Sequence, residues 1–295
     1  MSVDASYQQI TYAVEHQIAT ITLNRPKARN GYTLQMADEL GAALRAANVD
    51  DGVRVVVLTG AGQDFTVGAD LAGGTLAVTE PDADQGSWVE PASRATRPLY
   101  DMEKPVIAAI RGAAVGVGST MILAADFRLA ASDSRFGFVF SRRGIYPEGG
   151  STWFLPRLVG MGRAMDWMIS GRLIPADEAL AAGLVTAVYE PDQLLPQAYA
   201  LAAELIEKTA PVSTAVIRKA LYRMSVLDSP EAAFVLDSQL IASCDDSADA
   251  AEGVSSFLQH RPPKFTGKVS RNQPTFLPWH NGNGNGNGAV GWGRS

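Results

Sequence analysis

The segment KPVIAAIRGAAVGVGST, residues 104–120, decides how this chain folds. Its first half, Pro105 to Ile110, is an almost unbroken apolar run, which is typical of a strand buried on both faces. Glycines at 112, 116 and 118 follow the run and predict a turn. Upstream, Val53 to Thr59 has the same apolar character and also runs into a glycine turn, at residues 60–62. Buried strands that alternate with helical sequence predict an α/β core.

The sequence before this core predicts a pair of strands and a helix. Ile10 to Val14 and Ile18 to Leu23 alternate in polarity and are separated by His16-Gln17, a pattern that favours two paired strands. Apolar residues at helical spacing begin after Thr33, a residue suited to cap a helix. From about Pro175 onward the pattern becomes helical, to near residue 260.

Two segments lack this periodicity. Residues 72–97 are rich in Gly, Ala, Pro, Glu and Asp and predict a mobile insertion, either a solvated surface loop or a functional lid. The chain ends in Asn-Gly repeats, a low-complexity composition that cannot pack a core. We therefore expect a core over residues 1–195, a helical C-terminal region over 196–268 and a disordered tail over 269–295.

Composition argues against several classes of protein. The 295 residues carry a net charge of −6 with dispersed basic side chains, so we expect no nucleic-acid partner. The sequence shows neither a long apolar run nor a signal peptide, and we expect no membrane association. The single cysteine, Cys244, is typical of a reducing cytoplasm, where we expect the protein to work. The isolated His16, His260 and His280 argue against a metal site.

The glycine turns after the two buried strands are candidates for stabilising negative charge on an oxygen. Backbone N–H groups at the start of a helix lack partners inside it, and they can donate to an oxyanion without reorganisation. Phe65 to Asp70 follows one strand, and Arg111 to Thr120 follows the other. Each alone is more typical of a tight turn. Gly116-Val117-Gly118 is not a dinucleotide fingerprint, because no G-x-G-x-x-G completes it.

Together with their surroundings, these segments resemble the enoyl-CoA hydratase/isomerase (crotonase) family. The resemblance spans residues 8 to about 268 and is carried by motifs in register at residues 23–30, 65–70, 104–110, 149–152, 181–185 and 252–258. It implies an α/β fold, a crotonase-like spiral of repeated strand-strand-helix units, with a C-terminal helical region that forms a homotrimer or a dimer of trimers. It also implies an enzyme that acts on an acyl-CoA thioester. Coenzyme A would be part of the substrate, with no cofactor bound permanently.

The resemblance further implies roles for individual residues. The N–H groups of Val67 and Val117 would hold the enolate oxygen, at positions where family members usually carry alanine and glycine. Near the C-terminus, Phe257 keeps an aromatic residue of the family, whereas His260 replaces a lysine that reaches the adenine end of coenzyme A. The residues placed along coenzyme A are Arg25, Lys27, Ala28, Gly68, Ala69, Asp70, Phe257 and His260.

The chain departs from the family's hydratases at both catalytic glutamates. By motif, the first glutamate falls on Thr120 and the second on Phe140, and neither side chain is a general base near neutral pH. Glu148 stands where isomerase-type members of the family place an acidic residue, and apolar neighbours would raise its pKa. The alternative for Glu148 is a carboxylate that stabilises the start of the following helix.

A shift of a double bond needs one group that takes and returns a proton, together with donors that hold the enolate. We therefore expect isomerase-type chemistry with Glu148 as the acid and base. Two alternatives stay open: an enoyl-CoA hydratase, and a catalytically silent acyl-CoA-binding protein. The acyl group is not identified by the sequence.

Overall fold

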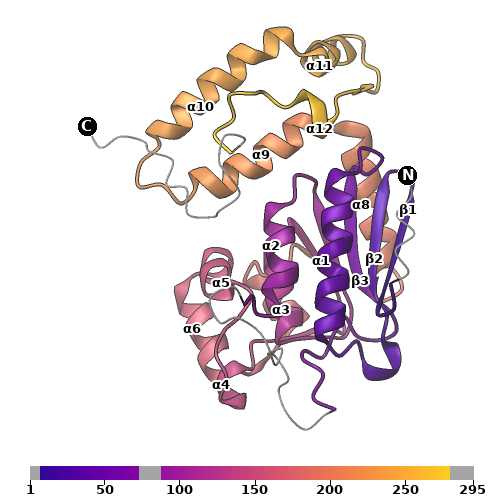
Figure 1. Ribbon diagram of the computed structural model, residues 1–295, viewed down its shortest axis with the longest axis vertical. Coiled ribbons are helices and arrows are strands. Elements are labelled where there is room, and N and C mark those ends of the chain that lie inside the picture. Colours follow the sequence, from indigo (N-terminus) through magenta and orange to yellow (C-terminus); the bar gives the residue numbers. More distant parts are fainter. Residues whose placement is uncertain (1–6, 73–87, 280–295) are drawn as a thin grey trace. The chain divides into compact units, whose positions relative to one another are not determined.

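The computed structural model describes residues 7–72 and 88–279 (Figure 1). The chain falls into two compact units that divide between Ala203 and Glu204, within helix α8 (Leu194–Lys208). Among the described residues, no helix combines the length and the apolar character needed to cross a membrane.

The first unit is built on a six-stranded sheet with the order β1-β2-β3-β4-β6-β9. An antiparallel hairpin opens it, and its two turn residues, His16 and Gln17, have positive φ. From β2 onward, neighbouring strands are parallel. The strands are β1 (Ile10–Glu15), β2 (Ile18–Leu23), β3 (Val55–Gly60), β4 (Val106–Ile110), β6 (Phe127–Ala131) and β9 (Ala187–Tyr189). The predicted hairpin and both predicted buried strands are confirmed.

The apolar runs of β3 and β4 reflect burial on both faces. All of β4 is buried, as is β3 up to its last residue. Helix α1 (Leu34–Val49) begins as predicted, because the Thr33 side chain accepts the Met36 N–H at 3.1 Å. α1 packs against α2 (Ser93–Asp101), and these two helices stand side by side in Figure 1. α2 also packs against α3 (Val117–Met121).

A second, three-stranded sheet with the order β5-β7-β8 winds the chain into a spiral. β5 (Ala113–Val115) follows β4 and leads into α3, while β7 (Arg135–Gly137) follows β6 and leads into α4 (Phe140–Arg143). β8 (Leu173–Pro175) pairs with β7. The strand-strand-helix unit that we expected is therefore present, and the predicted α/β class is confirmed.

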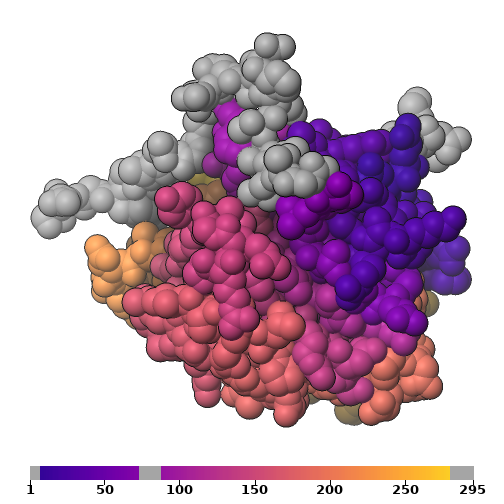
Figure 2. Space-filling view, turned by 90° about the horizontal axis from the view of Figure 1, so that it is seen from below, coloured from indigo at the N-terminus to yellow at the C-terminus, as the bar shows by residue number. Residues whose placement is uncertain are grey.

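Short helices complete the first unit. They are η1 (Pro26–Ala28), η2 (Ile122–Ala124), α5 (Ser151–Val159), α6 (Met161–Ser170) and α7 (Ala176–Ala181). In the space-filling view, the N-terminal residues in indigo and the residues of about 140–170 in pink cover different sides of one face (Figure 2). Residues far apart in the sequence thus share this face.

Part of the predicted mobile insertion, residues 72–97, is regular structure instead. Helix α2 begins at Ser93 and buries Ala95, Thr96 and Leu99. Pro98 and the neighbouring arginines interrupt this short apolar face, so the sequence shows no clear period there. Residues 73–87 lie outside the described part of the chain, and for them the prediction stays untested.

The second unit is helical. Its elements are α9 (Pro211–Met224), α10 (Glu231–Ala242), η3 (Ser243–Asp246), α11 (Ala248–Leu258) and α12 (Val269–Asn272). Val216, Leu236 and Leu277 form a buried cluster, with Trp279 packed against it. Ordered structure therefore reaches into the segment expected to be a disordered tail from residue 269. Leu277 and Trp279 pack this segment against the helices of the second unit. Two isolated apolar residues give no helical or strand periodicity, so the sequence did not predict ordered structure here. The Asn-Gly repeats lie outside the described residues.

Candidate active site

The turns that follow β3 and β4 lie side by side. Thr66 N–H donates to the Ala113 carbonyl at 2.9 Å, and Val115 N–H donates back to the Thr66 carbonyl at 3.1 Å. Gly68 permits this approach, because a Cβ at its position would stand 2.9 Å from the Val115 oxygen, and its φ is +92°. The two glycine turns singled out in the sequence therefore meet at one place.

Two backbone N–H groups at this place are free to bind a ligand. Among the described residues, the N–H groups of Ala69 and Val117 have no acceptor; Val117 is the first residue of α3, where helical N–H groups lack internal partners. The N–H of Val67, by contrast, donates to the Arg29 carbonyl at 3.2 Å. The loop that carries Arg29 thus accepts from the donor that the resemblance assigns to Val67, and the role of this donor toward an enolate stays a prediction.

Glu148 is brought to the helix that Val117 begins. It precedes two glycines, Gly149 and Gly150, which have φ of +58° and +68° and turn the chain into α5. The Thr120 hydroxyl lies 3.5 Å from Glu148 Oε1, at the limit of a hydrogen bond, and 3.2 Å from the Val117 carbonyl. Thr120 therefore links the Glu148 carboxyl to the first turn of α3.

The environment of Glu148 suits proton transfer near neutral pH. Burial, and next the charge of Glu90, raise the pKa of Glu148 from 4.5 to about 7, against the opposing hydrogen bond from Thr120. The Glu148 side chain does not cap α5, because Gly150 occupies the N-cap position and no side chain caps it. Glu148 bonds to Ser151 through its main-chain carbonyl, which accepts the Ser151 N–H at 3.0 Å. The Glu148 carboxyl therefore makes no capping hydrogen bond to α5.

A second carboxylate, Glu90, lies beside Glu148 and was not singled out in the sequence. Its Oε1 accepts the Gly149 N–H at 2.8 Å and also a hydrogen bond from the Ser93 hydroxyl. Its Oε2 is buried and has no hydrogen-bond partner among the described residues. Glu90 belongs to the segment of residues 72–97 that lacks periodicity, so no sequence signal set it apart from other surface acids.

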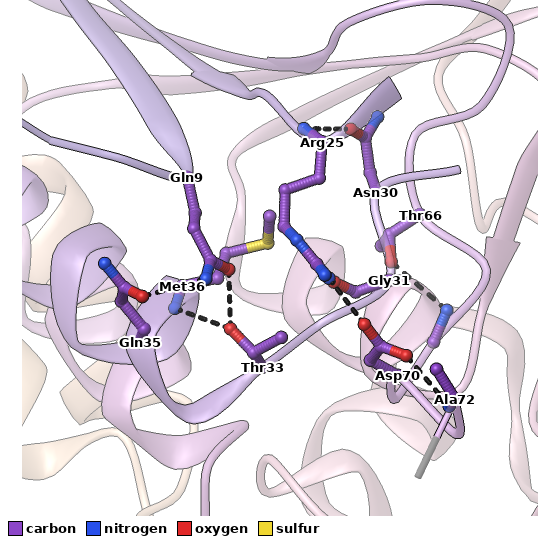
Figure 3. Close-up of polar contacts among 11 residues, drawn as sticks. Gln9, Arg25, Asn30, Gly31, Thr33, Gln35, Met36, Thr66, Asp70 and Ala72 are labelled. Atoms are coloured by element: carbon purple, nitrogen blue, oxygen red, sulfur yellow. Dashed lines mark hydrogen bonds and ion pairs between the residues drawn. The ribbon is translucent and has the colours of Figure 1, made fainter. Parts of the chain in front are cut away.

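The loop after β2 joins the turn after β3 through an ion pair. The Arg25 guanidinium contacts Asp70 Oδ2 at 2.8 Å (Figure 3). Asn30 holds the loop from inside: its Oδ1 accepts the Arg25 N–H at 2.8 Å, and its Nδ2 donates to the carbonyls of Ala61 and Asp64 at 2.9 and 2.8 Å. The structure thus brings Arg25 together with the predicted coenzyme A segment that ends at Asp70.

The other residues placed along coenzyme A by resemblance lie on the surface. Lys27 and Ala28 are exposed in η1. In the second unit, Phe257 on α11 is 78% exposed, and His260 follows that helix with φ of +51°. Beside His260, Arg261 is held by Glu252 through contacts of 2.6 and 2.8 Å. Arg261 is thus engaged with Glu252, while His260 is exposed, and the phosphate contact of His260 stays a prediction.

Within residues 7–72 and 88–279, no group of three or more His, Cys, Asp and Glu side chains is arranged to hold a metal ion. The chemistry visible in the first unit rests on a carboxyl that titrates near neutral pH and on free backbone donors.

A strand-strand-helix spiral with these features is a crotonase fold. The solved structure of an enoyl-CoA hydratase from Polaromonas sp. JS666 matches with a TM-score of 0.80 at 29% identity, covering 87% of this chain and 99% of that one. A family model described as enoyl-CoA hydratase/isomerase matches residues 13–268. The chain belongs to this family, and it is an enzyme of the crotonase type that acts on acyl-CoA.

The relatives include both hydratases and isomerases. An enoyl-CoA hydratase from Alternaria alternata is 37% identical over 249 residues, which is 84% of this chain and 82% of the relative. A 1,2-epoxyphenylacetyl-CoA isomerase from Escherichia coli K12 is 35% identical over 256 residues, 86% of this chain and 97% of the relative. The predicted family is therefore confirmed, while the choice between its reactions rests on the site.

Proposed function

We propose that this enzyme shifts a double bond in an enoyl-CoA thioester, with Glu148 as the single acid and base. The observation that carries the proposal is the position of Glu148: a carboxyl with a pKa raised to about 7, linked through Thr120 to the helix start that offers the free Val117 N–H. A group with a pKa near the working pH can both accept and return a proton.

The proposed reaction has two proton transfers. Glu148 takes a proton from the carbon activated by the thioester, and the electron pair moves onto the thioester oxygen as an enolate. The N–H groups of Val117 and of Val67 or Ala69 donate to that oxygen. The Ala69 N–H has no acceptor among the described residues, whereas the Val67 N–H has to release the Arg29 carbonyl. Protonated Glu148 then returns the proton to a different carbon, which places the double bond in its new position. Coenzyme A takes part only as a portion of the substrate, and no permanently bound cofactor is required.

Coenzyme A is proposed to lie along the loop after β2 and the turn after β3. The Arg25 pair with Asp70 fixes that surface, and basic side chains suit phosphate groups. At the adenine end, the proposal assigns Phe257 for stacking and His260 for a phosphate contact. The full set is Arg25, Lys27, Ala28, Gly68, Ala69, Asp70, Phe257 and His260.

Hydration is the second candidate, because Glu90 supplies another carboxylate next to Glu148. Its Oε1 is bonded to the Gly149 N–H, and its Oε2 is a buried acceptor without a partner among the described residues. Two carboxyl groups can position one water molecule, which a single carboxyl does less readily. The hydratase relatives add weight to this candidate.

The test compares rates on a panel of 3-enoyl-CoA and 2-enoyl-CoA substrates. Faster conversion of 3-enoyl-CoA to its 2-enoyl isomer supports the proposal, and faster hydration of 2-enoyl-CoA supports the second candidate. Glu148→Gln is expected to lower kcat by about 10²-fold or more while acyl-CoA binding persists. Glu190→Gln, an exposed acid after β9, is the matched control and should keep full activity. Binding without any turnover would point to a catalytically silent acyl-CoA-binding protein.

A further inference from the structure

Glu90 makes contacts that an ordinary surface glutamate does not make. It reaches from the segment before α2 to the Gly149 N–H, the peptide that follows Glu148, at 2.8 Å. The Ser93 hydroxyl donates to the same oxygen and holds the side chain from its own segment. Hydrogen bonds donated to a carboxylate are stronger than those donated to a neutral acceptor. Glu90 is therefore fixed in place next to the turn that carries the catalytic carboxyl.

The second oxygen of Glu90 has no such support. Oε2 is buried without a hydrogen-bond partner among the described residues. A buried carboxylate oxygen without a donor is costly, unless a proton or a water molecule is available to it at some stage. Glu90 therefore brings an acceptor with unused capacity to the turn that carries Glu148.

We propose that Glu90 is a positioning residue for Glu148: it anchors the Gly149 turn through Oε1 and places a fixed negative charge beside the Glu148 carboxyl. A negative charge beside a carboxyl disfavours its ionised form, so the Glu148 carboxyl binds its proton more tightly than it would beside a neutral residue. The charge of Glu90 makes ionised Glu148 a stronger base for the first proton transfer. This inference deepens the proposed function and rests on it for the role of Glu148.

Three elements besides the Gly149 turn bring groups to this pair. Tyr32, before α1, is buried, and its pKa is raised well above its usual value by burial, by Glu148 and Glu90, and by Asp38, against an opposing effect of Arg94 on α2. Tyr32 therefore stays neutral at working pH and adds no charge. Thr120 on α3 contributes an uncharged hydroxyl. Among these groups, Glu90 is the one whose charge raises the pKa of Glu148.

The test replaces Glu90 by glutamine, which keeps an oxygen acceptor for the Gly149 N–H and removes the charge. If Glu148 acts as the base, kcat/KM of the wild type rises with pH as Glu148 loses its proton. In Glu90→Gln the midpoint of that rise should move to lower pH by about one unit. Asp101→Asn, which removes a carboxylate from the end of α2, is the control and should leave the midpoint in place.

A direct titration separates this inference from the proposed function. The ¹³C signal of the Glu148 carboxyl, assigned by its absence in Glu148→Gln, is followed against pH in the ligand-free protein. A lower midpoint in Glu90→Gln supports the inference, even if Glu148→Gln turns out to be fully active and the proposed function fails. An unchanged midpoint in Glu90→Gln overturns the inference, even if Glu148→Gln is inactive.

A second variant covers the case in which Glu90→Gln does not fold. Glu90→Asp keeps the charge but draws it back from Glu148, so its midpoint should fall between those of the wild type and a neutral residue. A merely structural role would lower activity in Glu90→Asp without moving the midpoint, and that result would also overturn the inference.

Discussion

Glu148 couples the stability of the protein to pH. Its pKa is raised from 4.5 to about 7, so the folded protein holds this proton more tightly than the unfolded chain does. The stabilisation is complete below about pH 4.5 and is lost as pH rises through 7. A shift of this size, reduced for partial exposure to solvent, corresponds to roughly 2 kcal/mol.

Glu148→Gln should therefore stabilise the protein at pH 8, because glutamine stays neutral in the same buried place. Urea unfolding is expected to give a free energy of unfolding above that of the wild type by roughly 2 kcal/mol at pH 8. At pH 4.5 the two proteins should be nearly equal. A variant that is less stable than the wild type at pH 8 would show that Glu148 is held by contacts of its ionised form.

The sequence predicts individual site residues only where a motif marks them. Glu148 stands in such a motif, and in the structure its carboxyl lies next to Thr120 on α3. Glu90 does not, because its contact with Gly149 joins residues far apart in the sequence. No local pattern shows that the Arg29 carbonyl accepts from the Val67 N–H and leaves the Ala69 N–H without an acceptor among the described residues.

Asn30 joins the loop after β2 to the loop after β3. Its buried side chain makes three hydrogen bonds with backbone groups, and its φ is +54°, a conformation that asparagine tolerates better than most residues. Asn30→Ala should lower the free energy of unfolding by about 3 kcal/mol, because buried backbone groups lose their partners. It should also raise KM for acyl-CoA, since the loop carries Arg25.

The matched control is Arg29→Ala, one residue earlier in the same loop. Arg29 pairs with Asp64 at 2.7 Å, but its side chain is largely exposed, so its loss should cost about 0–1 kcal/mol. Urea unfolding and KM measurements on both variants make the comparison. Equal effects of the two substitutions would mean that the Asn30 hydrogen bonds do not hold the loop.

Elements with long apolar patterns could be predicted, and short ones could not. β3, β4 and α1 have enough buried residues to show a period. β5, β7 and β8 have three residues each, too few for a period, and they become strands because the spiral supplies their partners. α2 was missed for a different reason, because Pro98 interrupts its narrow apolar face.

Several large apolar side chains of the second unit are exposed, an arrangement that is typical of protein–protein interfaces. Ile217 and Leu221, one helical turn apart on α9, are 59% and 67% exposed. Phe234 on α10 and Phe257 on α11 are also exposed. Such surface is expected to be buried between copies of the chain, which supports the predicted homotrimer or dimer of trimers.

Light scattering at micromolar concentration should give a mass of three or six times 31.3 kDa. The double variant Ile217→Asp, Leu221→Asp places charges on the exposed face of α9 and should shift the mass toward that of one chain. Val49→Asp, a single exposed apolar residue (75%) at the end of α1, is the control and should keep the assembled mass.

If Phe257 and His260 reach coenzyme A from a neighbouring subunit, the double variant should also bind coenzyme A more weakly, by calorimetry, than Val49→Asp does. A wild type that is a stable monomer would contradict both expectations, because the exposed helices would then have no partner and the two residues no neighbouring site.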